Sequence, residues 1–358
     1  MFAAVTITLV LPLVIAHQHH LNGAVAVADV TTKEWYTKFG PQADLPFSGP
    51  ASFNHFPYAR CPEDARDAFD IAILGFPFDN TVTNRPGARF GPRAIRIASG
   101  GAGYTLAWGT SPMDWGSGAR GSWIAEMFYP FFDLFTKCTV QSLQVSDGCG
   151  SLPQLIRSQV IHFDAHFDTS MITTDGPGRL HHGSYFTIAH EEGLLSNTSI
   201  HGGIRQHASA GISAPALDLT FVQKERSIIP HDESLGFAVI TTEDLDDYGL
   251  EAVVRTIRRR VGNTPVYLSL DIDTIDPGMA PATGTPVDGG WSTREMKRIL
   301  RGLSGLNFVT SGCDVVEVSP AYDLAEITSR AAAGFVNDFL QMMQMETPPK
   351  PHSGPFLE

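Results

Sequence analysis

Five side chains of types that bind metal ions lie two residues apart within two short motifs: Asp164, His166, Asp168, Asp271 and Asp273. Each motif directly follows an apolar run, 160–163 or 266–270. In an extended chain, residues i, i+2 and i+4 share one face, so the side chains of each motif can converge. One such motif alone could be a salt-bridged strand end. Two of them bring four carboxylates together, and these repel unless cations neutralise them. The pair therefore predicts a metal site.

The donor types indicate which ion the site would bind. Oxygen ligands with one imidazole and no thiolate favour a hard or borderline divalent ion, with Mn²⁺ ahead of Zn²⁺. Carboxylates that bridge two ions hold them ~3.5–4 Å apart, the spacing used by two-metal hydrolases. The sequence thus predicts two manganese ions and a hydrolytic reaction.

Short apolar runs alternate with helical patterns along the chain. The runs predict strands buried on both faces, as in a parallel sheet, at 71–74, 160–163, 238–241, 266–270 and 315–318. The helical patterns cover 250–261, 293–303 and 325–345, and Glu295 three residues after Ser292 favours a helix start there. This alternation predicts an α/β fold, a three-layer α-β-α sandwich around a mostly parallel sheet with its site at the carboxyl ends of the strands.

Composition excludes some partners and indicates a leader. The chain is 43% hydrophobic with a formal net charge of −13, which argues against nucleic acid and anionic membrane. Residues 1–16 are apolar and 26–28 are small, which predicts a signal peptide over 1–28, a single domain over 29–346 and a disordered tail over 347–358. The leader has no Lys or Arg, so a buried N-terminal strand or a wrongly chosen start codon is the alternative reading. The four cysteines form no metal motif and assign no disulfide.

The chain resembles the ureohydrolase family of arginases and agmatinases, and most closely its agmatinase branch. The resemblance rests on RPGARFGPRAIR (85–96), HFDAHFD (162–168), HHGSYF (181–186), SLDIDTIDPGMAPATGTPVDGG (269–290) and DVVEVSPAYD (314–323). It implies that Asp164 and Asp271 bridge two manganese ions, one of which Asp168 also binds. His166 and Asp273 would complete the other site.

The same resemblance assigns roles to two further residues. Glu317 matches the carboxylate that pairs with a substrate guanidinium, and a planar bidentate pair would orient the reacting carbon. His182 matches the histidine that transfers protons to the departing amine, with neighbouring His181 as its rival. From the residues alone, Glu317 could instead cap a turn, and either histidine could simply be exposed to solvent.

One ligand that the family carries is missing. Its Gly-Gly-Asp-His-Ser motif should precede the first ligand motif, but counting back from 151–158 puts Gly148 where the histidine belongs, and segment 120–160 is atypical throughout. We consider three explanations: a wrongly spliced coding sequence, a degenerate paralogue, or replacement of the ligand by His162, Cys149 or His181. Loss of one imidazole predicts weakened metal binding at that site. A milder departure is Ala282, which stands where the family usually has glycine and would be strained at positive φ.

The favoured function is manganese-dependent hydrolysis of agmatine to putrescine and urea, a step of polyamine biosynthesis. Guanidinobutyrate is the closest alternative substrate, and a non-catalytic metal-binding homologue is the second class of function. A deacetylase on the same fold is disfavoured because Glu317 is retained. We expect a small cationic guanidinium substrate and, from the resemblance, a homo-oligomer. A cleaved leader would put the protein in the secretory pathway, and a start-site artefact would leave it in the cytoplasm.

Overall fold

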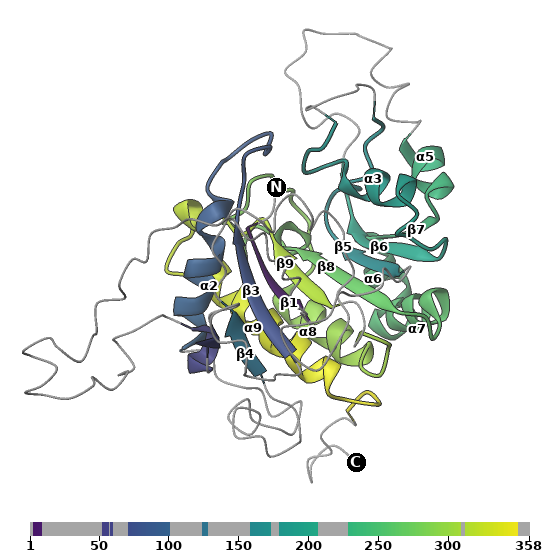
Figure 1. Ribbon diagram of the computed structural model, residues 1–358. Helices are drawn as coiled ribbons and strands as arrows, with labels where there is room; N and C mark the ends of the chain where they lie inside the picture. The colour runs from purple at the N-terminus through teal and green to yellow at the C-terminus, as the bar shows by residue number, and fades with distance from the viewer. Residues whose placement is uncertain are drawn as a thin grey trace, which may run out of the picture.

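The centre of this fold is a sheet whose strands contain apolar runs that are buried on both faces. The computed structural model describes residues 3–8, 52–56, 58–59, 71–100, 124–127, 158–172, 179–206, 228–308 and 312–349. Within them one sheet of nine strands has the order β2-β4-β3-β1-β9-β8-β5-β6-β7 (Figure 1). Its strands are β1 Ala3–Thr8, β2 Tyr58–Ala59, β3 Ile71–Pro77, β4 Ile124–Met127, β5 Gln159–Phe163, β6 Ser199–Ile204, β7 Phe237–Thr241, β8 Val266–Asp271 and β9 Cys313–Val316.

Helices cover both faces of this sheet. They are α2 Gly91–Ser99, α3 Tyr185–Glu191, α5 Ile228–Ser234, α6 Glu243–Tyr248, α7 Leu250–Val261, α8 Thr293–Gly302 and α9 Ile327–Met343. Ile161 of β5 belongs to the core that α2, α7, α8 and α9 bury, whereas its neighbour Val160 packs with α3 on the opposite side. Successive side chains of a strand point to opposite faces, so this alternation defines three layers and confirms the predicted sandwich.

The expected elements lie close to where the sequence places them. The helix predicted at 250–261 is α7, with both ends as expected. The helix predicted from residue 293 is α8, and Ser292 with Glu295 forms a reciprocal capping box at its start. In contrast, α9 starts at Ile327, two residues later than predicted, because Ala325 and Glu326 lie in the left-handed region.

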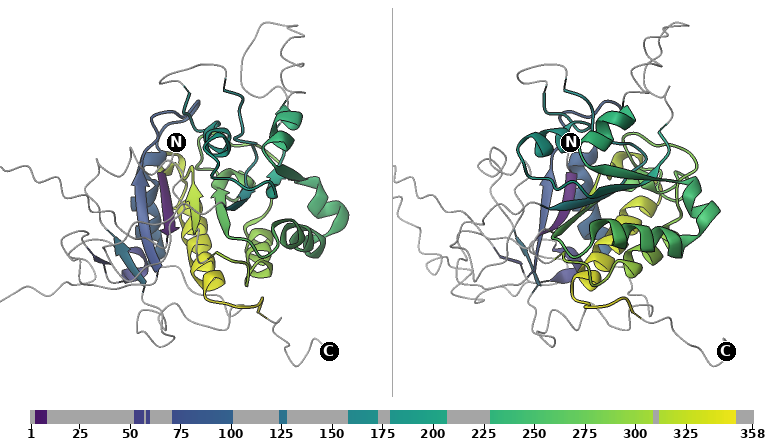
Figure 2. Two further views of the ribbon diagram at one scale, coloured as in Figure 1. Left: turned by 45° about the vertical axis from the view of Figure 1, so that its right-hand side comes forward. Right: turned by 90° about the vertical axis from the view of Figure 1, so that its right-hand side faces the viewer.

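The N-terminal strand β1 is the exception to the parallel pairing. It lies between β3 and β9 and runs antiparallel to both, with Thr6 paired to Leu74 on one side and to Asp314 on the other. The views in Figure 2 show this purple strand inside the sheet, beside β3. Residues 3–8 thus form a strand with a partner strand on either side. Cleavage of a leader over 1–28 stays a prediction, as do the domain boundaries.

Other predictions fall largely outside the described residues. Of the atypical segment 120–160 the structure describes 124–127 and 158–160, and of the predicted tail only 347–349. Gly148 and Cys149 lie outside these ranges. Among the helices that the structure describes, none combines the length and the hydrophobicity that a membrane span requires.

Candidate metal centre

Three neighbouring parallel strands deliver the predicted site residues to one edge of the sheet. Phe163 at the end of β5 pairs with Leu270 of β8, and Asp271 at the end of β8 pairs with Val316 of β9. The residues that follow these strand ends therefore emerge side by side, as the carboxyl ends of parallel strands do. The expected convergence of the two ligand motifs is confirmed.

The first ligand group consists of Asp164, His166 and Asp273, each offering one donor atom within 4.8 Å of the others. The Nδ1 atom of His166 lies 3.0 Å from Oδ2 of Asp273 and 3.2 Å from Oδ1 of Asp164. The other oxygen of Asp273 accepts a hydrogen bond of 3.0 Å from the Ala165 backbone N–H. All three side chains are among the predicted ligands.

A second ligand group consists of His162, Asp164 and Asp168, again with donor atoms within 4.8 Å of one another. Asp164 is common to both groups, as expected of a carboxylate that bridges two ions. His162 is fully buried in β5, and its Nε2 lies 3.0 Å from Oδ2 of Asp164. The sequence indicates His162 only as one of three possible replacements for the missing ligand.

Asp271, predicted to bridge the ions, belongs to neither group. It is buried, and one of its oxygens accepts a hydrogen bond of 2.9 Å from the Asp273 backbone N–H. Burial, followed by repulsion from Asp273 and Asp164, raises its pKa well above the ordinary value. Asp271 thus lies close enough to Asp164 and Asp273 to be repelled by both, and without a bound cation its neutral form is favoured.

The charges of the site do not balance within the protein. Burial and the neighbouring carboxylates raise the pKa values of Asp168, Asp271 and Asp273. Burial also opposes ionisation of Asp164, but the imidazoles of His162 and His166 hold its pKa below the usual range. Bound divalent cations would remove this excess of negative charge. Two groups, each with one imidazole and two carboxylates, are also a donor set that suits such ions.

Two carboxylates of the site are held by unusual backbone. Asp168 and Glu317 have φ values of 52° and 61°, in the left-handed region that side-chain-bearing residues rarely adopt. Such conformations cost about 1–3 kcal/mol each and are concentrated at functional sites. Ala282 is not among the described residues at positive φ, so the strain considered for it does not arise.

Glu317 is 7% exposed and lies beside the loop that follows β8. A Cβ atom added at Gly284 would be 3.4 Å from its Oε2, so glycine there leaves space next to the carboxylate. Burial, together with repulsion from Asp273 and Asp164, raises the pKa of Glu317 to about 7. A cation brought to this carboxylate would favour its ionised form.

The loop that contains Arg85 and Gly87 packs against the segment after Glu317. Gly87 has φ 138°, and a Cβ atom there would be 2.6 Å from Oγ of Ser319, so only glycine allows this approach. The guanidinium of Arg85 lies 5.4 Å from the centre of the Tyr322 ring. The segments 85–96 and 314–323, which both carry the family resemblance, therefore meet beside Glu317.

His182 is half-buried, and burial lowers its pKa to about 4, so its imidazole is neutral at neutral pH. Its rival His181 is fixed within its own loop: its Nδ1 accepts a hydrogen bond of 3.2 Å from the Gly183 N–H, and its backbone N–H donates to Ser184 Oγ. This difference favours His182 over His181 as the histidine that exchanges protons.

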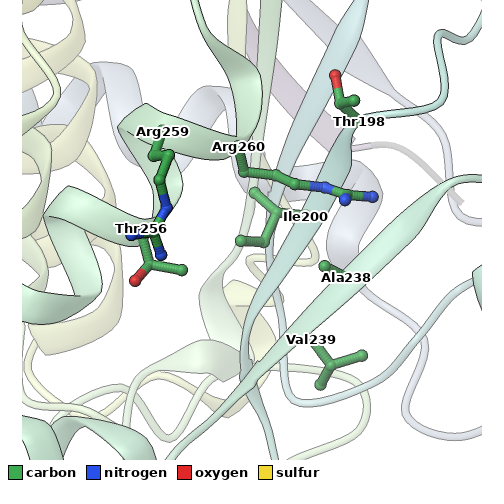
Figure 3. Close-up of a pocket in the computed structure, with 7 residues that line it drawn as sticks. All are labelled: Thr198, Ile200, Ala238, Val239, Thr256, Arg259 and Arg260. Atoms are coloured by element: carbon green, nitrogen blue, oxygen red, sulfur yellow. The ribbon is translucent and has the colours of Figure 1, made fainter.

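A separate cavity has a volume of about 330 Å³ (Figure 3). It lies between β6, β7 and α7 and is lined by Thr198, Ile200, Ala238, Val239, Thr256, Arg259 and Arg260. Arg260 donates hydrogen bonds to the backbone oxygens of Ser199 and Gly236, so it secures the fold there. None of these residues belongs to either ligand group.

The sequence analysis missed the residues behind His162. Its Nδ1 lies 2.9 Å from Nδ1 of His201 in β6, whose Nε2 lies 2.9 Å from Oδ1 of Asp232 in α5. The signal for His201 is a polar residue in register with His162, but β6 contains two glycines and forms no apolar run. Asp232 carries no sequence signal of this contact.

Comparisons with known proteins agree with this geometry. A family model described as "Arginase family" matches residues 69–119 and 151–341. The chain is 39% identical to "Putative agmatinase 1" of Schizosaccharomyces pombe, with 86% of this chain and 85% of that protein covered. It is 33% identical to an agmatinase of Chromobacterium violaceum, with 86% and 92% covered.

Solved structures show the same relationship. A hypothetical agmatinase from Burkholderia thailandensis superposes with a TM-score of 0.62 at 29% identity, covering 85% of this chain and 94% of that one. Proclavaminate amidino hydrolase from Streptomyces clavuligerus gives 0.62 at 27% identity, covering 85% and 100%. With the family model, the relatives and the ligand groups in agreement, the chain belongs to the arginase family of binuclear-metal hydrolases that act on guanidino compounds.

Proposed function

We propose that this chain hydrolyses the guanidinium group of agmatine, releasing urea and putrescine, with manganese as its metal. The observation that carries the proposal is the placement of Glu317 at the same sheet edge as two ligand groups that share Asp164. The relatives named agmatinase support the substrate. The donor set of oxygens and imidazoles supports Mn²⁺.

In this proposal, Glu317 binds the substrate. Its buried carboxylate accepts two parallel hydrogen bonds from a planar guanidinium, which fixes the orientation of the central carbon. The cation also compensates the buried charge, so the carboxylate ionises as the substrate arrives, although its pKa before the substrate binds is about 7. Substrate binding and ionisation of Glu317 are therefore coupled.

His182 handles the proton that the departing amine needs. With a pKa of about 4 it is neutral in the resting protein, so it must take up a proton before it can donate one. Once protonated, it is a strong enough acid to transfer the proton readily. Bound metal ions, held by the two ligand groups, would supply an activated water and stabilise developing negative charge.

The test is urea release by the full chain loaded with Mn²⁺, with agmatine, guanidinobutyrate and arginine compared. We expect agmatine to be the best substrate, and E317Q to lose at least about 2 kcal/mol of transition-state stabilisation, or about 30-fold in kcat/KM. Higher activity on guanidinobutyrate would mean that guanidinobutyrate, and not agmatine, is the substrate, while guanidinium hydrolysis would stand as the reaction. A folded, metal-loaded chain that releases no urea from any of them would refute the proposal.

Two features of the chain bear on this test. The missing histidine at Gly148 favours a non-catalytic metal-binding homologue as the second candidate, and the absence of urea release would support it. The family resemblance also supports a homo-oligomer, which light scattering of the same sample would measure.

A further inference from the structure

His162 lies where polar groups approach from two sides. Its side chain is fully buried, with the edge of Phe186 at a ring-centre distance of 4.8 Å. Nε2 lies 3.0 Å from Oδ2 of Asp164 and, as a longer contact, 3.4 Å from the Tyr185 hydroxyl. Nδ1 faces the other way, toward His201. The two nitrogens therefore serve different neighbours.

Contacts with His201, and through it with Asp232, hold the ring of His162 from behind. Asp232 is fully buried, and its Oδ1 accepts a hydrogen bond of 2.8 Å from the Thr169 hydroxyl. The same oxygen lies 2.9 Å from Nε2 of His201, which must donate to it. Nδ1 of His201, 2.9 Å from Nδ1 of His162, can then accept a hydrogen bond from that nitrogen. In that tautomer, the lone pair of His162 is on Nε2 and can bind a metal ion.

Nε2 of His162 and Oδ2 of Asp164 are 3.0 Å apart, close enough for both atoms to bind one cation. Asp168 supplies a third donor atom within 4.8 Å of them. The resulting set of one imidazole and two carboxylates matches the group formed by His166, Asp164 and Asp273 in composition.

No other described segment supplies an imidazole to this group. Strand β1 follows β9 and β8 in the sheet on the side away from β5, and its sequence AAVTIT contains neither histidine nor carboxylate. The ring of His181 accepts a hydrogen bond from the Gly183 N–H within its own loop. Among the described residues, His162 is thus the histidine grouped with Asp164 and Asp168.

We propose that Nε2 of His162 coordinates one of the two metal ions, replacing the imidazole that is missing at Gly148. His201 and Asp232 act as positioning residues that hold the ring in the tautomer able to coordinate. Metal-binding histidines commonly donate their other N–H to such a partner. The inference rests on the proposed function only in requiring that the site holds metal ions.

The direct test counts imidazole nitrogens bound to manganese. His166 is 23% exposed at its side chain, so H166A should remove the imidazole of the other group without opening the core. In H166A loaded with Mn²⁺, pulsed electron paramagnetic resonance should still detect one coupled imidazole nitrogen, and ¹⁵N-labelled histidine should shift that signal. Adding H162Q should abolish it. Absence of the signal in H166A, or its survival in the double variant, would overturn the proposal.

Metal affinity gives a second readout that needs no activity. The wild-type chain should bind two manganese ions tightly. In H162Q one of the two sites should bind its ion at least about 100-fold more weakly. H201Q should weaken the same ion by about 10–100-fold, the range typical of partners behind a ligand. H190Q, a matched exchange in α3 outside both groups, should change neither ion. Equal manganese affinities in wild type and H162Q would contradict the assignment.

These measurements separate the two proposals. A chain that holds two ions through His162 and releases no urea would refute the proposed function while His162 remains a ligand. If the wild-type chain releases urea and H162Q binds manganese as tightly as wild type, the proposed function stands and His162 is not a ligand.

Discussion

Replacing Glu317 by glutamine should stabilise the metal-free protein at pH 8, although it removes the proposed substrate contact. The carboxylate is 7% exposed, and burial is the main cause that raises its pKa from 4.5 to about 7. Below about pH 4.5 the group is protonated in both the folded and the unfolded chain and costs nothing. Between these values the unfolded chain ionises first, so the folded state loses stability as pH rises.

The size of this loss follows from the two pKa values. The difference between about 7 and 4.5, at 1.36 kcal/mol per pKa unit, is about 3 kcal/mol once the pH exceeds the higher value. Glutamine has nearly the same shape and never ionises. The free energy of unfolding of E317Q should therefore exceed that of wild type by only about 0.4 kcal/mol at pH 4.5, where the unfolded carboxyl is half ionised, and by about 3 kcal/mol at pH 8.

The assay is urea denaturation of chelator-treated wild type and E317Q across this pH range. Guanidinium salts are unsuitable because they contain the cation that Glu317 is proposed to bind. The histidines whose pKa values are lowered by burial, such as His182, titrate equally in both proteins, so their contribution cancels in the difference. Bound Mn²⁺ should shrink the gap, because nearby cations favour the ionised carboxylate. A gap that is absent at pH 8, or as large at pH 4.5, would refute this reasoning.

Three further exchanges test the frame around the site. K297A should lower the free energy of unfolding by about 3 kcal/mol, because Lys297 Nζ lies 2.7 Å from the buried carboxylate of Asp338; adding D338N should restore much of it in urea denaturation. S292A should cost about 1 kcal/mol in the same assay by removing the cap of α8, with manganese content unchanged. G202A should cost about 1–3 kcal/mol, seen as a lower thermal midpoint, because its new Cβ would lie 2.9 Å from the ring of Phe163; an unchanged midpoint would mean that the ring can move.

Elements that depend on local sequence could be predicted, and those imposed by tertiary contacts could not. Helix α7 and strand β8 were predictable because their apolar spacing identifies them without help from neighbours. Strand β6 has the sequence SIHGGI, which forms no apolar run, and its extended conformation is completed by pairing with β5 and β7 on either side.

The candidate site divides in the same way. Spacing was enough to predict that the motifs of Asp164, His166 and Asp273 converge, because two parallel strand ends carry them to one edge. The chain from His162 through His201 to Asp232 joins three elements far apart in sequence, and no local pattern encodes it. The position of Asp271 outside both groups likewise depends on its hydrogen bond to the Asp273 N–H, which spacing does not reveal.

The place of β1 in the sheet sets an order for folding during synthesis. Its first partner, β3, is made soon after it, but its second partner, β9, starts at Cys313, about 305 residues after Thr8. At roughly 5–20 residues per second, that edge of β1 waits on the order of 15–60 s for its neighbour. Until β9 is made, that edge of β1 presents backbone N–H and C=O groups that β9 will later pair, and an open strand edge of this kind can pair with another chain instead.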